Sequence, residues 1–138
     1  MSDFKIVNST FSFSTKGEIE FVDITNQICD AVANSSVKNG LVHVFAPHTT
    51  GIILLTENDP ALIQDLQRFF EKIVPKSLSY NHPANAYAHL RSILFPPDRT
   101  IPVMDGKVIF GTWQSLFFVE TDNQPRRRKI VIQIMGEI

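Results

Sequence analysis

The stretch APHTTGIILLTENDP, residues 46–60, combines a histidine, a short apolar run and a helix start. Residues 41–45 and 52–55 are mainly β-branched or apolar, which predicts two short strands joined by the His48 segment. Asp59 can accept hydrogen bonds from free backbone amides, and Pro60 suits the first position of a helix. His48 is therefore expected at a strand end, where a side chain can reach a ligand without disturbing the core.

Alternation and helical spacing extend this pattern to both ends of the chain. Apolar residues alternate with polar ones from Phe4 to Phe13, which predicts two half-buried strands interrupted near residues 8–10. A strand over residues 18–22 and a helix capped by Asp23 follow. A short helix starts near Asn85, and four later strands are expected over residues 100–104, 107–110, 115–120 and 129–135. The pattern predicts an α+β fold, sandwich-like, with two or three helices and mainly antiparallel sheet.

Composition limits the class of protein. A chain of 138 residues buries one core, so residues 1–138 are expected to form a single domain. The net charge of −1 supplies no field that would hold the protein on nucleic acid or an anionic membrane. Cys29 is the only cysteine, residues 1–5 do not lead into a signal core, and no apolar run approaches ~20 residues. We expect a cytoplasmic protein that binds neither nucleic acid nor membranes.

Three of the four histidines are candidate metal ligands. His48, His82 and His89 each lie in a loop or near a helix end, whereas His43 alternates within a strand and is interpreted as a packing or edge residue. Three neutral imidazoles can hold zinc or a similar ion and leave a position open for water or a substrate oxygen. The familiar two-histidine helical motif is absent, so separate hydrogen-bonding roles fit the spacing equally well.

Acidic and basic residues give two further candidates. Glu57 could transfer a proton or orient a ligating histidine, or it could simply end a strand. In the run PRRRK, residues 125–129, Arg128 and Lys129 are interpreted as a solvated strand edge. Arg126 and Arg127 are interpreted as phosphate ligands, because guanidinium groups bind phosphoryl oxygens bidentately. The chain lacks the basic stripe with interleaved aromatics that nucleic-acid binding requires.

Four segments carry a resemblance to a known family: PHTTGIILLTENDP, IVPKSLSYNHPANAYAHLRSILFPP, TIPVMDGKVIFGTWQSLFFVETDNQPRRRKIVI and the terminal MGE. In this order they resemble the signatures of the YjbQ-like family, often labelled secondary thiamine-phosphate synthase. The resemblance covers nearly the whole chain and is weakest before residue 40. It implies a compact α+β domain that assembles as a homotrimer, with its polar signature residues gathered in a pocket.

The family's motif falls on three groups of positions. They are His48, Thr49, Thr50 and Glu57; His82, Asn85, His89 and Arg91; and Gly111, Thr112, Trp113, Gln114, Glu120 and Arg126–Arg128. The sequence departs from its relatives at Gly51, where many have alanine, after Glu57, where some have an extra residue, and at residues 95–97. The first two departures lie beside the proposed site, so they bear on substrate preference more than on the fold.

The resemblance implies an enzyme with a divalent metal, zinc favoured over magnesium, that acts on a small phosphorylated substrate. The implied reaction joins a pyrimidine diphosphate to a thiazole phosphate. Metal-dependent hydrolysis and a non-catalytic trimeric ligand-binding protein are the alternatives. The implied metal ligands are His48, His82 and His89; the implied catalytic residues are Glu57, His48, His89 and Gln114; and the implied ligand-binding residues are Thr49, Thr50, Asn85, Arg91, Trp113, Arg126 and Arg127.

Two of these residues have a second interpretation. Trp113 is first of all a core or interface anchor, because its ring buries a large apolar area. Arg91 either reaches a phosphate at the rim of the pocket or forms an ion pair with an acid such as Glu57 or Asp59.

Overall fold

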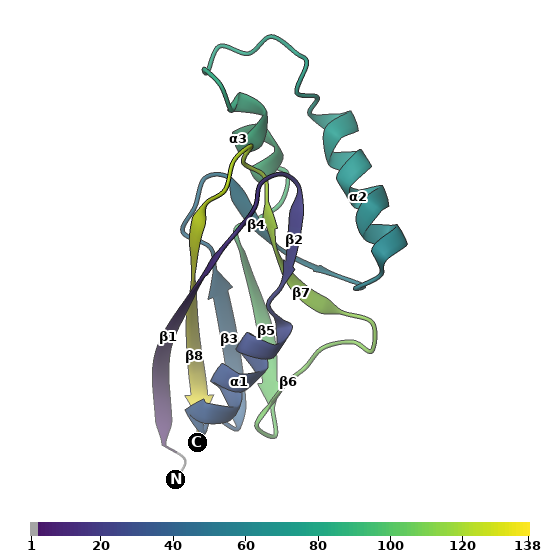
Figure 1. Cartoon of the computed structure of the whole chain (residues 1–138). Helices are drawn as coiled ribbons and strands as arrows, with labels where there is room; N and C mark the ends of the chain where they lie inside the picture. The colour runs from purple at the N-terminus through teal and green to yellow at the C-terminus, as the bar shows by residue number, and fades with distance from the viewer. Residues whose placement is uncertain (1–2) are drawn as a thin grey trace.

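The computed structural model describes residues 3–138 and contains eight strands and three helices in that range (Figure 1). The strands are β1 (Phe4–Ser14), β2 (Glu20–Asp23), β3 (Asn39–Phe45), β4 (Gly51–Thr56), β5 (Asp98–Met104), β6 (Lys107–Val108), β7 (Ser115–Glu120) and β8 (Arg127–Glu137). The helices are α1 (Thr25–Ser35), α2 (Pro60–Ile73) and α3 (Ala86–Ser92). The α+β class predicted from the sequence is confirmed.

The strands form two antiparallel sheets. The five-stranded sheet has the order β1-β8-β3-β5-β6, and the three-stranded sheet has the order β2-β7-β4. Strands β3 and β8 approach each other closely where Gly40 pairs with Gly136. A Cβ atom on Gly40 would lie 1.9 Å from the carbonyl oxygen of Met135, and one on Gly136 would lie 2.1 Å from that of Asn39. Only glycine fits at these two positions.

Strand β1 is continuous, so the expected interruption near residues 8–10 is wrong. Asn8, Ser9 and Thr10 each pair in register with β8. The backbone hydrogen bonds between β1 and β8 continue through these polar residues. The Asn8 side chain bonds to another side chain: its Oδ1 atom accepts a hydrogen bond from Gln133 Nε2 at 3.0 Å. A polar stretch on an exposed sheet face is therefore not a break in the strand.

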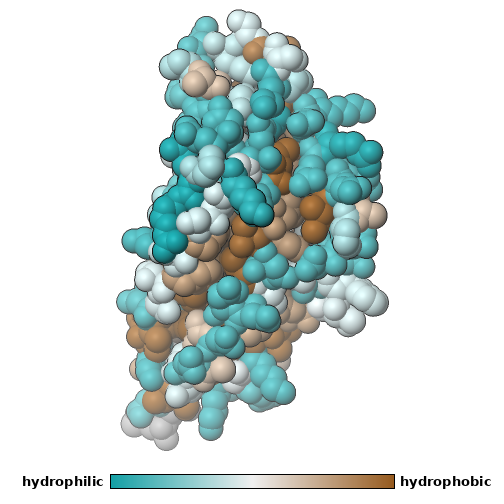
Figure 2. All heavy atoms as spheres, viewed as in Figure 1, coloured by the Kyte–Doolittle hydropathy of each residue, from teal (hydrophilic) through white to brown (hydrophobic). Residues whose placement is uncertain are grey.

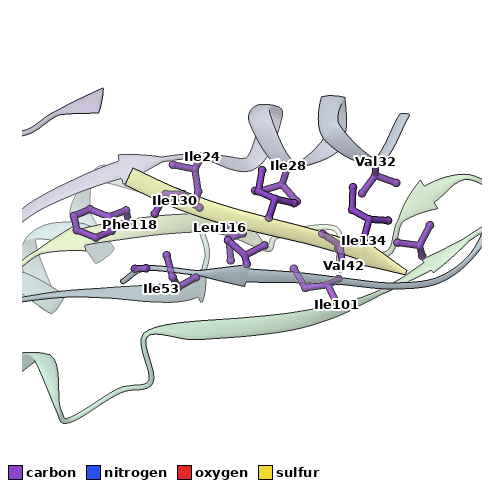
Figure 3. Close-up of a cluster of buried hydrophobic side chains, with 14 of the residues drawn as sticks. Ile24, Ile28, Val32, Val42, Ile53, Ile101, Leu116, Phe118, Ile130 and Ile134 are labelled. Atoms are coloured by element: carbon purple, nitrogen blue, oxygen red, sulfur yellow. The ribbon is translucent and has the colours of Figure 1, made fainter. Parts of the chain in front are cut away.

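Strand β7 is buried on both faces. Leu116 and Phe118 point into a core that also contains Ile28 of α1 and Ile130 of β8 (Figure 3). Phe117 packs on the opposite face of the three-stranded sheet, against Phe70 of α2. The sheet therefore lies between two apolar clusters, which explains why β7 reads as a nearly unbroken apolar run.

Helix α2 begins as the sequence predicts. Asp59 is its N-cap, and Asp59 Oδ2 accepts a hydrogen bond from the backbone amide of Leu62 at 2.9 Å. The helix ends at Ile73, just before Pro75. In Figure 2, hydrophilic atoms cover most of the α2 region, while hydrophobic side chains form a band across the middle and lower part of the same face. None of the helices within residues 3–138 is long and apolar enough to cross a membrane.

Helix α3 is tied to its surroundings by Arg91, which is fully buried. Arg91 Nε donates to the carbonyl oxygen of Val74 at 3.0 Å, and Nη1 donates to Glu18 Oε2 at 2.7 Å. The guanidinium carbon lies 4.9 Å from the centroid of the Tyr87 ring, and Lys76 Nζ lies 2.5 Å from the second oxygen of Glu18. One side chain thus joins α3 to the end of α2 and to the turn between β1 and β2.

We expect Arg91→Ala to lower the free energy of unfolding by about 3 kcal/mol, because the substitution empties the space of a fully buried side chain and removes its bonds to Glu18 and to the carbonyl oxygen of Val74. Urea denaturation followed by circular dichroism measures the change. Arg68→Ala is the matched control, since the Arg68–Asp65 pair is exposed and should contribute little. Equal midpoints for Arg91→Ala and the wild-type protein would contradict this role.

Candidate functional site

His48 lies between β3 and β4, held against the backbone of β8. Its Nε2 atom is 3.1 Å from the amide nitrogen of Lys129 and 2.9 Å from the carbonyl oxygen of the same residue. The pKa of His48 is lowered from its ordinary value of 6.5, chiefly by burial and further by the positive charge of Arg128. The Lys129 backbone and the charge of Glu120 oppose this shift only in part. The ring is therefore neutral at pH 7 and able to accept a proton.

A buried ion pair lies behind His48. Glu120, at the end of β7, is completely buried, and Arg128 of β8 is 6% exposed. Arg128 Nε donates to Glu120 Oε1 at 2.8 Å, and Arg128 Nη2 contacts Glu120 Oε2. Arg128 Nη2 also donates to Thr50 Oγ1 at 2.9 Å, and the Thr15 hydroxyl donates to Glu120 Oε1 at 2.5 Å. These contacts satisfy both charges and link the two sheets.

The interpretation of Arg128 as a solvated edge residue is wrong. Ile130, Ile132 and Ile134 all point into the core, and a strand returns to the same face every second residue. Extending this alternation backwards puts Arg128 on the core face and Lys129 on the exposed face. The alternation of β8 thus indicates that Arg128 is buried, although its place in a run of charged residues suggests that it is exposed.

Asp122 is the second buried carboxylate of the site, at 2% exposure. It accepts hydrogen bonds from the Asn123 amide at 2.8 Å, Arg126 Nε at 2.9 Å, Thr50 Oγ1 at 3.2 Å and Asn85 Nδ2 at 3.3 Å. Burial alone would raise the pKa of Asp122, but the hydrogen bonds from Asn123, Asn85 and Arg126 outweigh it and hold the pKa below its ordinary value of 3.8. Asp122 is therefore a permanent negative charge at neutral pH.

These groups surround a polar hollow of about 430 Å³. It brings together six residues proposed from the sequence, along with Asp122 and Arg128, which sequence reasoning did not select. The lining residues are Pro47, His48, Thr49, Thr50, Asn85, His89, Asp122, Arg126 and Arg128. A second hollow of about 630 Å³ shares His48, Thr49 and His89 and continues along residues 92–97.

The ring of Phe118 forms a wall beneath this site. The centroid of the His48 ring lies 6.2 Å from that of Phe118, and the guanidinium carbon of Arg128 lies 5.6 Å from the Phe118 centroid. A Cβ atom on Gly51 would lie 2.3 Å from the same ring. Glycine at this position therefore allows Phe118 to pack directly beneath the histidine and the arginine.

His82 and His89 form a pair beside the polar hollow. Their ring centroids are 4.8 Å apart, and His82 Nδ1 lies 3.0 Å from the carbonyl oxygen of Pro83, which leaves Nε2 for a ligand. Two imidazoles on one tetrahedral zinc ion, with bonds of about 2.0–2.1 Å, have centroids about 5 Å apart. The pair thus fits two positions of a metal site. Across residues 3–138, no three His, Cys, Asp or Glu side chains are grouped closely enough to hold a metal ion, and His48 is not part of the pair.

Three residues proposed from the sequence lie at the opposite end of β4 and β7. Gly51 pairs with Glu120 at the end near His48, and Thr56 pairs with Ser115 at the other end. Five residues of strand separate these ends, or roughly 17 Å. Glu57 follows Thr56, and Trp113 and Gln114 precede Ser115, so none of the three reaches the polar hollow of its own chain.

Arg91 and Arg127 also lie outside the polar hollow. Arg91 was expected either at the pocket rim or paired with Glu57 or Asp59, and the structure instead pairs it with Glu18. Arg127 is exposed, and its Nη1 donates to Ser14 Oγ at 3.3 Å. Asn85 was expected to cap α3, but its side chain makes no cap hydrogen bond and reaches Asp122 instead. The turn that brings Asn85 to Asp122 could not be read from local spacing.

Comparison with known proteins identifies the family of this chain. The chain matches the profile of the family described as "UPF0047 protein YjbQ-like" over residues 9–137. A UPF0047 protein of Methanocaldococcus jannaschii is 39% identical over 129 residues, which cover 92% of this chain and 93% of that protein. A UPF0047 protein of Methanothermobacter thermautotrophicus is 38% identical over 126 residues, covering 89% of this chain and 87% of that protein.

Solved structures show the same fold. A YbjQ-like protein of unknown function from Sulfolobus solfataricus superposes with a TM-score of 0.94 at 34% identity, covering 98% of this chain and all of that chain. A yjbq/upf0047 family protein from Clostridium acetobutylicum has a TM-score of 0.87 at 36% identity, covering 91% and 98% of the two chains. The chain therefore belongs to the YjbQ-like family of UPF0047 proteins.

Proposed function

We propose that the protein binds a small phosphorylated metabolite in the polar hollow and acts on it with the help of a divalent metal ion. The observation that carries this proposal is the convergence of His48, His89, Asn85 and Arg126 on one hollow, from four separate segments of the chain. Sites of this kind, with a few convergent polar groups, are where small ligands bind.

Arg126 is the best-placed phosphate ligand. Its Nε atom is engaged by Asp122, and its side chain is 39% exposed, so its terminal nitrogens remain available to a phosphoryl group. Asn85 and the Thr49 hydroxyl add donors from the facing segments. Arg128 is less available, because Glu120 and Thr50 engage its Nε and Nη2 atoms and leave only Nη1 for a ligand.

The balance of charge favours a metal ion. The two guanidinium groups of Arg126 and Arg128 are already paired with Asp122 and Glu120. A phosphate dianion would therefore enter a site with no net positive charge of its own. When bound by His82 and His89, a divalent ion would supply that charge and polarise the phosphoryl group. His48, which is neutral at pH 7, is placed to accept or return a proton at the hollow.

The reaction that we propose is transfer with departure of pyrophosphate, as in the formation of thiamine phosphate. Hydrolysis of a phosphorylated metabolite and binding without turnover are the competing functions. Transfer requires two organic substrates, and the polar hollow of about 430 Å³ lies within the size range of pockets that hold small ligands. We further propose a closed homotrimer, supported by the resemblance and by exposed apolar side chains on the surface.

The lowered pKa of His48 predicts a pH dependence of stability. In the unfolded chain His48 takes up a proton near pH 6.5, whereas in the folded chain it does so only at a lower pH. The contribution of His48 to the free energy of unfolding is therefore fully present above pH 6.5 and is lost as the pH falls. In metal-free protein, His48→Gln should flatten the slope of unfolding free energy against pH below about 6.5. Denaturant titrations from pH 5 to 8 measure the slope. An unchanged slope in the variant would show that His48 titrates normally.

Metal binding tests the histidine pair. Elemental analysis of the purified protein should find a divalent metal, and His82→Ala or His89→Ala should remove most of it. His43→Ala is the matched control, because His43 pairs with Asp98 on another surface and should leave the metal in place. Occupancy should be lower in acid than at neutral pH, because neutral imidazole is the ligand form. Equal metal content in all three variants would exclude the pair as ligands.

Pyrophosphate binding tests the role of Arg126. Arg126→Ala should weaken binding by about 1.5–3 kcal/mol, roughly tenfold or more, because a charge-assisted hydrogen bond is lost. Arg127→Ala removes the same charge one residue away, on the exposed side, and should change binding little. Calorimetric titration with pyrophosphate measures both. Equal weakening of pyrophosphate binding in the two variants would indicate that the net charge of the region attracts pyrophosphate, and that Arg126 makes no specific contact with it.

Turnover separates the competing functions. The metal-loaded protein is incubated with a pyrimidine diphosphate, with and without a thiazole phosphate, and the products are identified by mass spectrometry. A coupled product together with pyrophosphate supports transfer. Release of phosphate from either compound alone supports hydrolysis, and binding without product supports the non-catalytic alternative.

A further inference from the structure

Trp113 is unusually exposed for a tryptophan. It is the only tryptophan of the chain, and 72% of its surface is accessible. The loop that carries it is held in shape: the Gln114 amide donates to the Gly111 carbonyl oxygen at 3.1 Å, and the Gly111 amide donates to Gln114 Oε1 at 2.8 Å. A large aromatic ring presented to solvent on a fixed loop is typical of an interface anchor.

An apolar hollow lies at the other end of the same chain. It is the 630 Å³ hollow that adjoins His48 and His89, and its wall is formed by residues 92–97. Ile93 is 76% exposed and Leu94 is 39% exposed along this wall. Exposed apolar side chains gathered around a hollow indicate a surface that is covered in the working protein.

The tryptophan cannot fill the hollow of its own chain. The 111–114 loop precedes the start of β7, whereas the hollow borders His48, at the far end of the β4–β7 pair. Figure 1 shows the loop between β6 and β7 on the opposite side of the molecule from α3, whose last residue, Ser92, lines the hollow. An exposed apolar ring and an exposed apolar hollow therefore occupy two distant surfaces of one chain.

We infer that Trp113 of one copy of the chain occupies the 630 Å³ hollow of a second copy. The two surfaces lie on opposite sides of one chain, so copies can associate head-to-tail, and a rotation that brings the last copy back to the first closes a ring, as in the proposed homotrimer. The partner's Gln114 is then carried to the neighbourhood of His48 and His89. The second copy thus completes the apolar side of the ligand site, which a single chain leaves open.

This arrangement accounts for a feature of the site that one chain does not explain. The Gly-Thr-Trp-Gln motif at residues 111–114 and the histidine motif at residues 48–50 lie at opposite ends of a strand pair, yet both carry residues suited to a ligand. In a head-to-tail ring, both motifs line one site at each subunit boundary. The inference rests on the proposed function only in treating the hollows beside His48 as the ligand site.

The outer face of the five-stranded sheet is the competing surface for association. Ile6, Met135 and Leu41 lie side by side across β1, β8 and β3, and Ile6 and Leu41 are 53% and 44% exposed. Association through that face would bring together two copies of the same surface. This face provides the control variant Ile6→Asp.

Fluorescence of the single tryptophan tests the inference. In the wild-type protein at micromolar concentration, Trp113 should emit at short wavelength and resist acrylamide quenching, because the partner's hollow excludes water from it. Ile93→Asp should shift the emission to longer wavelength, increase quenching and reduce the mass measured by light scattering. Ile6→Asp should leave emission and quenching as in the wild-type protein. Far-UV circular dichroism checks folding, and Leu94→Asp is the second hollow variant should Ile93→Asp not fold.

Two results would overturn the inference. One is a wild-type protein whose tryptophan emits as an exposed residue at concentrations where light scattering detects an oligomer. The other is Ile93→Asp and Leu94→Asp proteins that keep the wild-type mass while Ile6→Asp becomes monomeric. Neither measurement involves a ligand or a metal, so loss of pyrophosphate or metal binding would count against the proposed function and leave the association intact.

Discussion

Strand β7 is buried on both faces, and the other strands and helices pack around it in two apolar clusters. One face of β7 packs against α1 and the five-stranded sheet, and the other packs against α2. The strand ends in Glu120, so a carboxylate is carried to the edge of two apolar clusters, where an unpaired charge is costly. Arg128 approaches from β8 and balances it, aided by Thr15 and Thr50. The fold therefore holds a fixed pair of charges where the two sheets meet.

The chemistry of the site follows from that balance. Because each buried acid has an arginine partner, the floor of the polar hollow is rigid and nearly neutral. A rigid neutral floor positions side chains well but attracts an anion weakly, which is why a metal ion and the free end of Arg126 become important to the proposed function. Phe118 completes the floor, and the absence of a side chain at Gly51 brings its ring close to His48. An alanine at this position would force that ring to shift.

The motif residues lie in two separate places, the polar hollow and the loop before β7. His48, Asn85, His89 and Arg126 face one another across the polar hollow, so a single chain suffices to assemble them. Trp113 and Gln114 lie beyond the other end of β7. A strand is stiff over this length, and no bending of the loop brings the two groups together in one chain. The association inferred above would bring the two groups together across a boundary between copies.

Local pattern alone predicted much of the fold. The apolar runs of β4 and β7, the Asp59–Pro60 helix start and the helical spacing of α1 are all short-range features, in which each residue's neighbours decide its conformation. The resemblance pointed to six residues that line the polar hollow, and also to Glu57, Trp113 and Gln114, which lie at the other end of β4 and β7. The interruption predicted in β1 was wrong because pairing with β8, which is remote in sequence, decides that segment.

Only the tertiary structure decided which charges are buried and which residues meet. Arg91 and Arg128 look like surface residues in the sequence, yet both are buried and paired with an acid. Arg91 pairs with Glu18, 73 residues away, and Arg128 pairs with Glu120, 8 residues away on β7. Asp122 accepts a hydrogen bond from Asn85, which lies 37 residues away in the sequence. Secondary structure depends on neighbours along the chain, which the sequence displays directly. Ion pairs and sites depend on how strands and helices pack in space, because burial sets the cost of a charge and therefore selects its partner.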